Sequence, residues 1–293
     1  MNWATSRFSI DLSQPRVMGI VNVTPDSFSD GGHFSQTSSA LAHCDNLVAQ
    51  GADILDIGGE STRPNAAVVP VEEELARVLP VVRHAVTLGV PVSVDTYKPA
   101  VMQAVLDLGA DIINDVWALR WQGEDGLSGQ EVVVRHGRCG VCLMHMHREP
   151  QTMQAAPMQG DVVPQVLSFL KQHAQDLCGL GVEKARISID PGIGFGKTVE
   201  QNFRLLARQS ELLTLGFPVL AGWSRKSSLV AVTQNSLANA ATLDRHERMV
   251  PSVAAAVLAV ERGARVVRVH DVKETVQALK VWRAMQAALG NNP

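Results

Sequence analysis

The sequence predicts an α/β fold, a (β/α)8 TIM barrel formed by a single domain over residues 1–293. Eight short runs rich in valine and isoleucine alternate with stretches of helical spacing, and the runs are almost continuously apolar. Strands of that kind belong to a parallel sheet that helices cover on its outside. Eight such alternations in one domain favour a closed barrel over an open doubly wound sheet.

The expected strands follow from these runs in chain order. They are Val17–Val23, Ile54–Gly58, Val90–Asp95, Ile112–Asp115, Gly140–His145, Ile187–Asp190, Pro218–Ala221 and Val266–His270. Before the first strand, Arg7–Leu12 and the turn Ser13–Arg16 are expected to form a hairpin that closes the barrel floor. The sequence contains no linker or low-complexity segment that would divide the chain.

Between the expected strands, apolar residues recur every three or four positions, which places them on one face of a helix. Three such faces are formed by Leu75, Val78, Leu79 and Val82, by Val163, Val166, Leu167 and Leu170, and by Val253, Val257 and Val260. A glycine stands where each of several helices would end before a strand, namely at Gly51, Gly89, Gly109, Gly181, Gly216 and Gly263. Glycine adopts the left-handed conformation of a helix C-terminus at little cost, so these positions mark helix ends.

Composition and charge exclude several classes of function. The formal net charge of −3 gives no reason to expect nucleic acid or an acidic membrane surface as a partner. Residues 1–7 lack the apolar core of a signal peptide, and no apolar run is long enough to span a bilayer. The four cysteines, without a secretory context, indicate reduced thiols. We therefore expect a soluble cytoplasmic protein whose partners are small molecules.

Polar residues end the expected strands. They are Asn22, Asp56, Asp95, Asn114, His145, Asp190, the pair Ser224 and Lys226, and the pair Arg268 and His270. A single buried aspartate could be a structural hydrogen-bond acceptor. In a barrel, however, the C-terminal ends of all strands meet at one mouth, where such enzymes place their active sites. The sequence therefore predicts an active site built from these residues.

The chemistry of this set divides by charge. Arg63, Lys226, Arg268 and His270 are or can become cationic, which suits a phosphate or a diphosphate. Asp95 and Asn114, together with Asp190, suit a flat heterocycle with several N–H donors, because a carboxylate accepts two parallel hydrogen bonds and an amide offers both donor and acceptor. The predicted ligand is a nitrogen heterocycle that carries phosphate.

Eight segments of the chain match a known family in the same order. They are Met18–Gly32, Asp56–Pro64, Ser93–Thr96, Ile113–Asp115, Leu143–Met146, Asp190–Lys197, Ser224–Ser227 and Arg268–Val272. On these segments the chain resembles the bacterial dihydropteroate synthases, a family of pterin-binding barrels, from nearly end to end. The resemblance implies a transferase of folate synthesis.

In the implied reaction, p-aminobenzoate attacks the C9 methylene of 6-hydroxymethyl-7,8-dihydropterin diphosphate, which releases diphosphate and forms 7,8-dihydropteroate. The resemblance also implies a Mg²⁺ cofactor whose protein ligand is the side-chain oxygen of Asn22. An aromatic amine is already a nucleophile, so we assign no general base. Catalysis should rest on stabilising the leaving diphosphate and the cationic pterin.

The resemblance assigns roles to individual residues. The implied pterin ligands are Asp95, Asn114, Met144, Asp190 and Lys226. The implied diphosphate ligands are Asn22, Arg63, Arg268 and His270. The implied p-aminobenzoate site comprises Phe28, Thr62, Pro64, Phe195 and Ser224, with Asp30 beside it. The residues expected to be catalytic are Lys226, Asp95, Arg268 and His270.

Two glycine-punctuated segments, Val23–Phe34 and Gly59–Ala66, are expected to act as mobile lids over the mouth. Because sulfonamides mimic p-aminobenzoate, the resemblance implies inhibition by sulfonamides. It also implies a homodimer formed through outer helices.

Three other motifs carry less weight. Cys139 and Cys142 form a C-x-x-C, but no second pair completes a zinc site. His145 and His147 lack a third ligand at a suggestive spacing. Gly192–Thr198 imitates a P-loop except for Pro191, and its glycines are expected to let the backbone approach a flat ligand.

Two alternative functions stay open. One is a pterin-binding methyltransferase barrel, which would share Asp95 and Asn114 but would not need Lys226 or the Arg268–His270 pair. The other is a catalytically silent paralogue that only binds pterin, which would be expected to have lost diphosphate ligands. A sugar-phosphate enzyme would leave Asn114 and Asp190 unexplained.

Overall fold

Eight parallel strands close into a barrel in the computed structural model, which describes residues 1–24, 33–62, 66–124, 126–149, 152–233 and 245–290. The barrel strands are β3 Arg16–Asn22, β4 Ile54–Gly58, β5 Val92–Asp95, β6 Ile112–Asp115, β7 Gly140–Met144, β8 Ile187–Asp190, β9 Val219–Ala221 and β10 Ala264–Val269. Each strand pairs with its neighbours in the sequence, and β10 closes the ring by pairing with both β9 and β3. The predicted barrel is confirmed.

Strand boundaries agree with the sequence prediction to within two residues. The largest differences are two residues, at β10, which begins at Ala264 rather than at Val266, and at β5, which begins at Val92 rather than at Val90. Proline has no N–H to donate to a ladder, and Pro91 contributes only its carbonyl, which accepts from Leu55 N at 3.1 Å.

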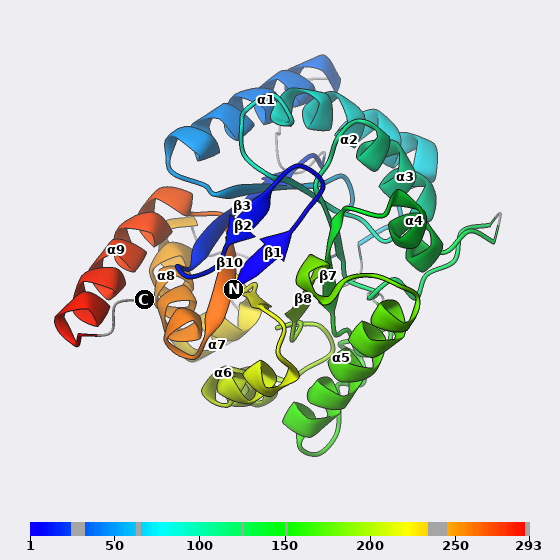
Figure 1. Cartoon of the computed structure of the whole chain (residues 1–293). Helices are drawn as coiled ribbons and strands as arrows, with labels where there is room; N and C mark the ends of the chain where they lie inside the picture. The colour runs from blue at the N-terminus through cyan, green and yellow to red at the C-terminus, as the bar shows by residue number, and fades with distance from the viewer. Residues whose placement is uncertain (25–32, 63–65, 125, 150–151, 234–244, 291–293) are drawn as a thin grey trace.

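Helices surround the barrel (Figure 1). They are α1 His33–Ala49, α2 Val71–Ala85, α3 Pro99–Asp107, α4 Gly129–His136, α5 Val162–Gly179, α6 Val199–Ala207, α7 Ser227–Thr233, α8 Arg245–Glu261 and α9 Val272–Ala288, with short 3-10 helices η2 Lys184–Arg186 and η3 Gln209–Leu215. All six glycines predicted to precede strands have φ between +71° and +97°. Within the described ranges, no helix is both long and apolar enough to cross a membrane.

A hairpin lies across one end of the barrel, as predicted, but its extent differs from the prediction. The paired strands are β1 Asn2–Ala4 and β2 Ser9–Asp11, with Trp3 opposite Ile10. Thr5 N donates to Phe8 O at 2.9 Å and closes the turn there. The segment Ser13–Arg16 therefore only leads from the hairpin into β3. The hairpin's position over the barrel is visible near the N-terminus in Figure 1.

The hairpin closes the floor with apolar side chains. Trp3, Ile10 and Leu12 are buried against one inward-facing residue from each of six barrel strands: Met18, Ile54, Ile112, Cys142, Leu220 and Val266. The Trp3 indole also donates to Arg186 O at 2.9 Å, so its polar atom is satisfied. The floor is thus a packed apolar core.

Alternation along the strands converts this apolar floor into a polar mouth. Side chains two residues apart on a strand share a face. Asp56 therefore follows Ile54 inside the barrel, and Asn114 and Arg268 follow floor residues in the same way. This spacing positions the polar set one layer above the apolar one.

Candidate active site

Asp56 on β4 accepts hydrogen bonds from three side chains on other strands. Arg268 Nε lies 2.6 Å from Asp56 Oδ2, and Ser93 Oγ lies 2.6 Å from Oδ1. Asn114 Nδ2 lies 3.4 Å from both carboxylate oxygens. The Asp56 side chain is fully buried, so these partners replace its hydration. One carboxylate thereby orients residues from β5, β6 and β10.

Arg268 also contacts Asp95, because its Nη2 lies 2.7 Å from Asp95 Oδ2. Burial would lower the pKa of Arg268, but the carboxylates of Asp56 and Asp95 raise it above its ordinary value. Burial in turn raises the pKa of Asp95 to about 7, against the opposing effect of Arg268. A predicted diphosphate ligand and a predicted pterin ligand therefore lie in direct contact.

Asp190 ends β8 and holds the glycine-rich loop that follows. Its Oδ1 accepts from Gly192 N at 2.7 Å, and burial raises the pKa of its carboxyl. At Gly192, φ is +68° and a Cβ would lie 1.8 Å from His145 O, so no side chain fits. The glycine is thus required by close approach of the protein's own backbone, whereas the sequence had suggested approach to a ligand.

A buried lysine supports the same loop from behind. Lys197 Nζ lies 2.9 Å from His145 Nδ1, 2.8 Å from Gly192 O and 3.1 Å from Phe195 O. Burial lowers the pKa of Lys197 to about 7, and burial together with Lys197 lowers the pKa of His145 to about 2. Protonation of His145 is therefore disfavoured, and its Nδ1 lies at hydrogen-bond distance from Lys197 Nζ.

Lys226 and Phe195 meet across two neighbouring loops. Lys226 Nζ lies 4.3 Å from the centroid of the Phe195 ring, a cation–π contact. Phe195 shares a buried cluster with the predicted pterin residue Met144. The predicted pterin side and the predicted p-aminobenzoate side therefore adjoin at these residues.

Ser224 and His270 form a second pair between loops. Ser224 Oγ lies 2.9 Å from His270 Nδ1 and accepts from His270 N at 3.1 Å. Arg225, which has φ of +60°, is held by Asp271 at 2.6 Å. The turn before α7 is therefore fixed to the end of β10, beside Arg268.

Of the remaining predicted site residues, the structure describes some and not others. Asn22 ends β3 beside Gly58 of β4 and is partly exposed, and Thr62 lies in the segment after β4. Phe28, Asp30, Arg63 and Pro64 lie outside the described residues. So do most of the predicted lid Val23–Phe34 and residues 63–65 of the predicted lid Gly59–Ala66.

The start of the second predicted lid is tied to the barrel by an ionic cluster. Glu60 pairs with Lys98, which also pairs with Glu74, and all three side chains are at most 10% exposed. Tyr97 donates its hydroxyl to Glu60 Oε1 at 3.0 Å. The sequence analysis missed this cluster, although Glu60 lies inside one of the matching segments.

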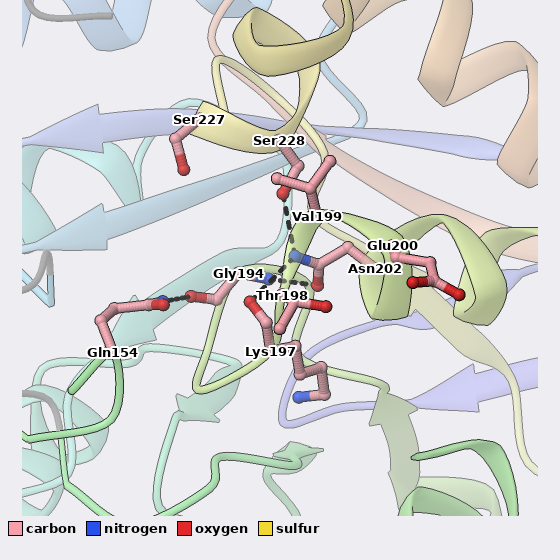
Figure 2. Close-up of a pocket in the computed structure, with 9 residues that line it drawn as sticks. All are labelled: Gln154, Gly194, Lys197, Thr198, Val199, Glu200, Asn202, Ser227 and Ser228. Atoms are coloured by element: carbon pink, nitrogen blue, oxygen red, sulfur yellow. Dashed lines mark hydrogen bonds between the residues drawn. The ribbon is translucent and has the colours of Figure 1, made fainter. Parts of the chain in front are cut away.

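A cavity of about 520 Å³ opens beside the glycine-rich loop and not over the strand ends (Figure 2). It is lined by Gln154, Gly194, Lys197, Thr198, Val199, Glu200, Asn202, Ser227 and Ser228. Its walls therefore come from the loop after β8, from the first turns of α6 and α7, and from Gln154 in the segment between β7 and α5. Ser227, the first residue of α7, is exposed here and was not assigned a role from the sequence.

The cysteine and histidine motifs do not form a metal centre among the described residues, where no group of three or more His, Cys, Asp or Glu could hold an ion. Cys139 and Cys142 are both free and buried. Asn22 offers a single neutral oxygen at the mouth. Mg²⁺ commonly keeps several waters and binds substrate phosphates, so such a site fits a metal that arrives with a diphosphate.

Comparison with known proteins agrees with this geometry. The pattern of the family described as pterin binding enzyme matches residues 18–270. The dihydropteroate synthase of Neisseria meningitidis serogroup B is 49% identical over 288 residues, which cover 97% of both chains.

Two solved structures extend the comparison to the fold. The Burkholderia cenocepacia dihydropteroate synthase complexed with 7,8-dihydropteroate is 46% identical, with a TM-score of 0.86 over 99% of this chain and 98% of that one. The Yersinia pestis enzyme in a sulfonamide drug complex is 42% identical, with a TM-score of 0.88 over 98% and 100%. The chain therefore belongs to the pterin-binding enzyme family and, within it, to the dihydropteroate synthases.

Proposed function

We propose that the chain condenses 6-hydroxymethyl-7,8-dihydropterin diphosphate with p-aminobenzoate to give 7,8-dihydropteroate and diphosphate. The amine nitrogen forms a bond to C9 while the bond from C9 to the diphosphate oxygen breaks. Diphosphate leaves with the electron pair, and the amine proton passes to solvent. The relatives of this chain that are named as dihydropteroate synthases support the reaction, including one complexed with the product.

The pterin is held by Asp95, Asn114, Asp190 and Lys226, with Met144 against its face. The three strand residues present carboxylate and amide groups that match the N–H and carbonyl edge of the ring. Asn114 and Asp190 are buried and the Asp95 side chain is only 11% exposed, so their hydrogen bonds with the pterin would form largely away from bulk water. An ionised Asp95 also stabilises positive charge on the pterin as the diphosphate departs.

The diphosphate is held by Arg268, His270, Asn22 and Arg63. Arg268 is already aimed by Asp56 and Asp95, so it loses little freedom when an anion binds. Ser224 can donate to His270 Nδ1, which would leave the other ring nitrogen to face the anion. Mg²⁺, bound through Asn22 and the diphosphate, would neutralise charge on the leaving group.

p-Aminobenzoate lies between Phe195, Ser224, Thr62, Phe28 and Pro64. The contact of Phe195 with Lys226 supports this placement, because it puts an aromatic wall next to the pterin side of the site. A sulfonamide would bind the same enclosure, and the Yersinia pestis relative named above was solved in a sulfonamide drug complex.

The observation that carries the proposal is the contact of Arg268 with both Asp56 and Asp95, because it joins an anion site to a heterocycle site. The test is diphosphate release by the purified protein with the pterin diphosphate and Mg²⁺, with and without p-aminobenzoate. Release that requires p-aminobenzoate and yields dihydropteroate is expected. Pterin binding without turnover would favour the silent paralogue, and methyl transfer from methyltetrahydrofolate would favour the methyltransferase.

Three further properties belong to the same proposal: residues 1–293 act as one domain, the enzyme works in the cytoplasm, and it is a homodimer. The net charge and the free cysteines support the compartment. Sedimentation equilibrium would test the dimer, since a mass of about one chain, 31.5 kDa, would contradict it.

A further inference from the structure

Asn202 on α6 joins the two loops that frame the candidate site. Its Oδ1 accepts from Gly194 N at 2.8 Å, and its Nδ2 donates to Ser228 Oγ at 2.8 Å and to Lys197 O at 3.4 Å. Gly194 and Lys197 belong to the loop after β8, whereas Ser228 lies in the first turn of α7. Figure 2 shows Asn202 between Gly194 and Ser228. Asn202 is only 1% exposed, so its amide serves this connection and does not face solvent.

The peptide of Gly194 is fixed on both sides. Asn202 accepts from its N–H, and Gln154 Nε2 donates to its carbonyl at 2.6 Å. Gly194 has φ of +83°, and a Cβ there would lie 3.2 Å from Lys226 Cδ. The fixed peptide therefore forms the surface against which the Lys226 stem lies, and Phe195 follows directly.

The other end of the connection is equally close to Lys226. Ser228 is two residues beyond it, and Leu229 N donates to Lys226 O at 3.0 Å in the same turn. A shift of α7 relative to the loop after β8 would therefore move the ammonium of Lys226 with respect to the Phe195 ring. The side-chain hydrogen bonds of Asn202 to both loops resist this shift.

We propose that Asn202 is a positioning residue that sets the spacing of Lys226 and Phe195, and thereby the width of the p-aminobenzoate side of the site. The kinetic effect expected from this role rests on the proposed function, because p-aminobenzoate is a substrate only in that reaction. Asn202 itself lies behind the loop and acts through the residues it holds. Of the proposed polar pterin ligands, Asp95, Asn114 and Asp190 are on strands, and only Lys226 lies on the turn that Asn202 holds.

The test compares Asn202→Ala with Gln209→Ala in the full-length protein. Gln209 is the matched control, because its buried side-chain amide donates to Ala259 O at 2.8 Å but belongs to η3, outside the site. Both variants lose buried hydrogen bonds, so both should lower the melting temperature. Only Asn202→Ala should reduce kcat/KM for p-aminobenzoate, by about 10- to 100-fold, since small misplacements of reacting groups have effects of that size.

Comparing the kinetic constants for the two substrates distinguishes a positioning role from general destabilisation. Although Lys226 also contacts the pterin, the other three polar ligands stay on their strands, so we expect KM for the pterin diphosphate to rise less than about threefold in Asn202→Ala. All constants of Gln209→Ala should stay within about twofold. Kinetic constants of Asn202→Ala that match those of the unsubstituted protein would overturn the proposal. Equal losses for both substrates, or equal losses in both variants, would also overturn it.

Hydrogen exchange tests the connection without turnover. Asn202→Ala should speed amide exchange at residues 192–197 and 226–229 together, and Gln209→Ala should not. If the unsubstituted protein shows no p-aminobenzoate-dependent release, the proposed function fails, but the exchange result still decides whether Asn202 couples the loops. Unchanged exchange in both segments would refute that coupling.

Discussion

The two ends of the barrel use the same strands for opposite purposes. At the floor, Ile54, Ile112 and Val266 pack under the N-terminal hairpin. Two residues later on the same three strands, Asp56, Asn114 and Arg268 form the polar cluster of the mouth. The backbone is continuous between the layers, so the side chains alone make one end stable and the other reactive.

The difference shows where each end draws its stability. The floor gains from apolar burial, at roughly 25 cal/mol for each Å² removed from water. The mouth buries Asp56, Asp95 and Asp190, whose desolvation opposes folding unless each finds partners. Asp56 finds them in Arg268 and Ser93, Asp95 in Arg268, and Asp190 in the backbone N–H of Gly192. Substitutions should therefore separate stability from activity according to the layer.

The largest expected effect is on activity at the mouth. Lys226→Ala should lower kcat/KM by about 100-fold or more, because it removes a preorganised cation from the site, while the fold stays intact. Lys184→Ala is the matched control, since Lys184 Nζ lies 4.9 Å from the Phe217 ring near the start of β8. Steady-state kinetics and circular dichroism would compare them. Near-normal turnover by Lys226→Ala would show that the role assigned to Lys226 is wrong.

The next effect contrasts two positions on one strand. Ile54→Ala should lower the free energy of unfolding by about 2–5 kcal/mol, because it opens a cavity in the floor. Kinetic constants of its folded fraction should change little. Asp56→Asn keeps the size of the side chain but removes the charge that orients Arg268, so it should reduce kcat by about tenfold or more. Urea unfolding and steady-state kinetics would check both variants. A loss of activity in folded Ile54→Ala, with normal activity in Asp56→Asn, would contradict the distinction between a stabilising floor and an active mouth.

A smaller effect concerns pH. With the pKa of Asp95 raised from 3.8 to about 7, kcat/KM for the pterin diphosphate should fall about tenfold per pH unit below 7, as the accepting carboxylate is protonated. Because the pKa is raised on folding, this group's contribution to stability is complete below pH 3.8 and is lost as the pH rises towards 7. A pH–rate profile of Asp95→Asn should lack this limb.

The smallest effect lies at the floor. Arg7 donates from its backbone N, Nε and Nη2 to the buried carboxylate of Asp111. Arg7→Ala should lower the free energy of unfolding by only about 1 kcal/mol, because Arg7 is one-third exposed and Asp111 keeps backbone donors, including Val92 N. Thermal unfolding would measure it, and a change in kcat would be unexpected.

The barrel could be predicted because its strands carry local signals. Eight apolar runs, six helix-ending glycines and eight polar strand ends are visible residue by residue, and these signals reinforce one another. The hairpin was placed less accurately, because β1 is three residues long and its turn at Thr5–Phe8 contains neither glycine nor proline. Such short strands are stabilised mainly by packing against the barrel floor, and local sequence does not reveal that packing.

The site divides in the same way. The predicted site residues lie at strand ends or in matching segments: Asp95, Asn114, Asp190, Lys226 and Arg268. The structure places Arg268 in contact with Asp95, and both Arg268 and Asn114 in contact with Asp56. The contacts of Lys197, Glu60 and Asn202 could not be predicted, because their partners lie on other elements and no sequence spacing encodes them. The roles of individual ligands stay predictions until variants are measured.

The closure of the barrel through β3 and β10 has a consequence for synthesis. The first barrel strand to leave the ribosome, Arg16–Asn22, must wait for Ala264–Val269 before one of its edges is paired. Trp3 likewise waits for Arg186, its hydrogen-bond partner 183 residues later. A nascent chain therefore carries an open strand edge and an undocked tryptophan through most of translation, and such edges promote aggregation. Chaperone protection of the growing chain should matter most just before the last strand emerges.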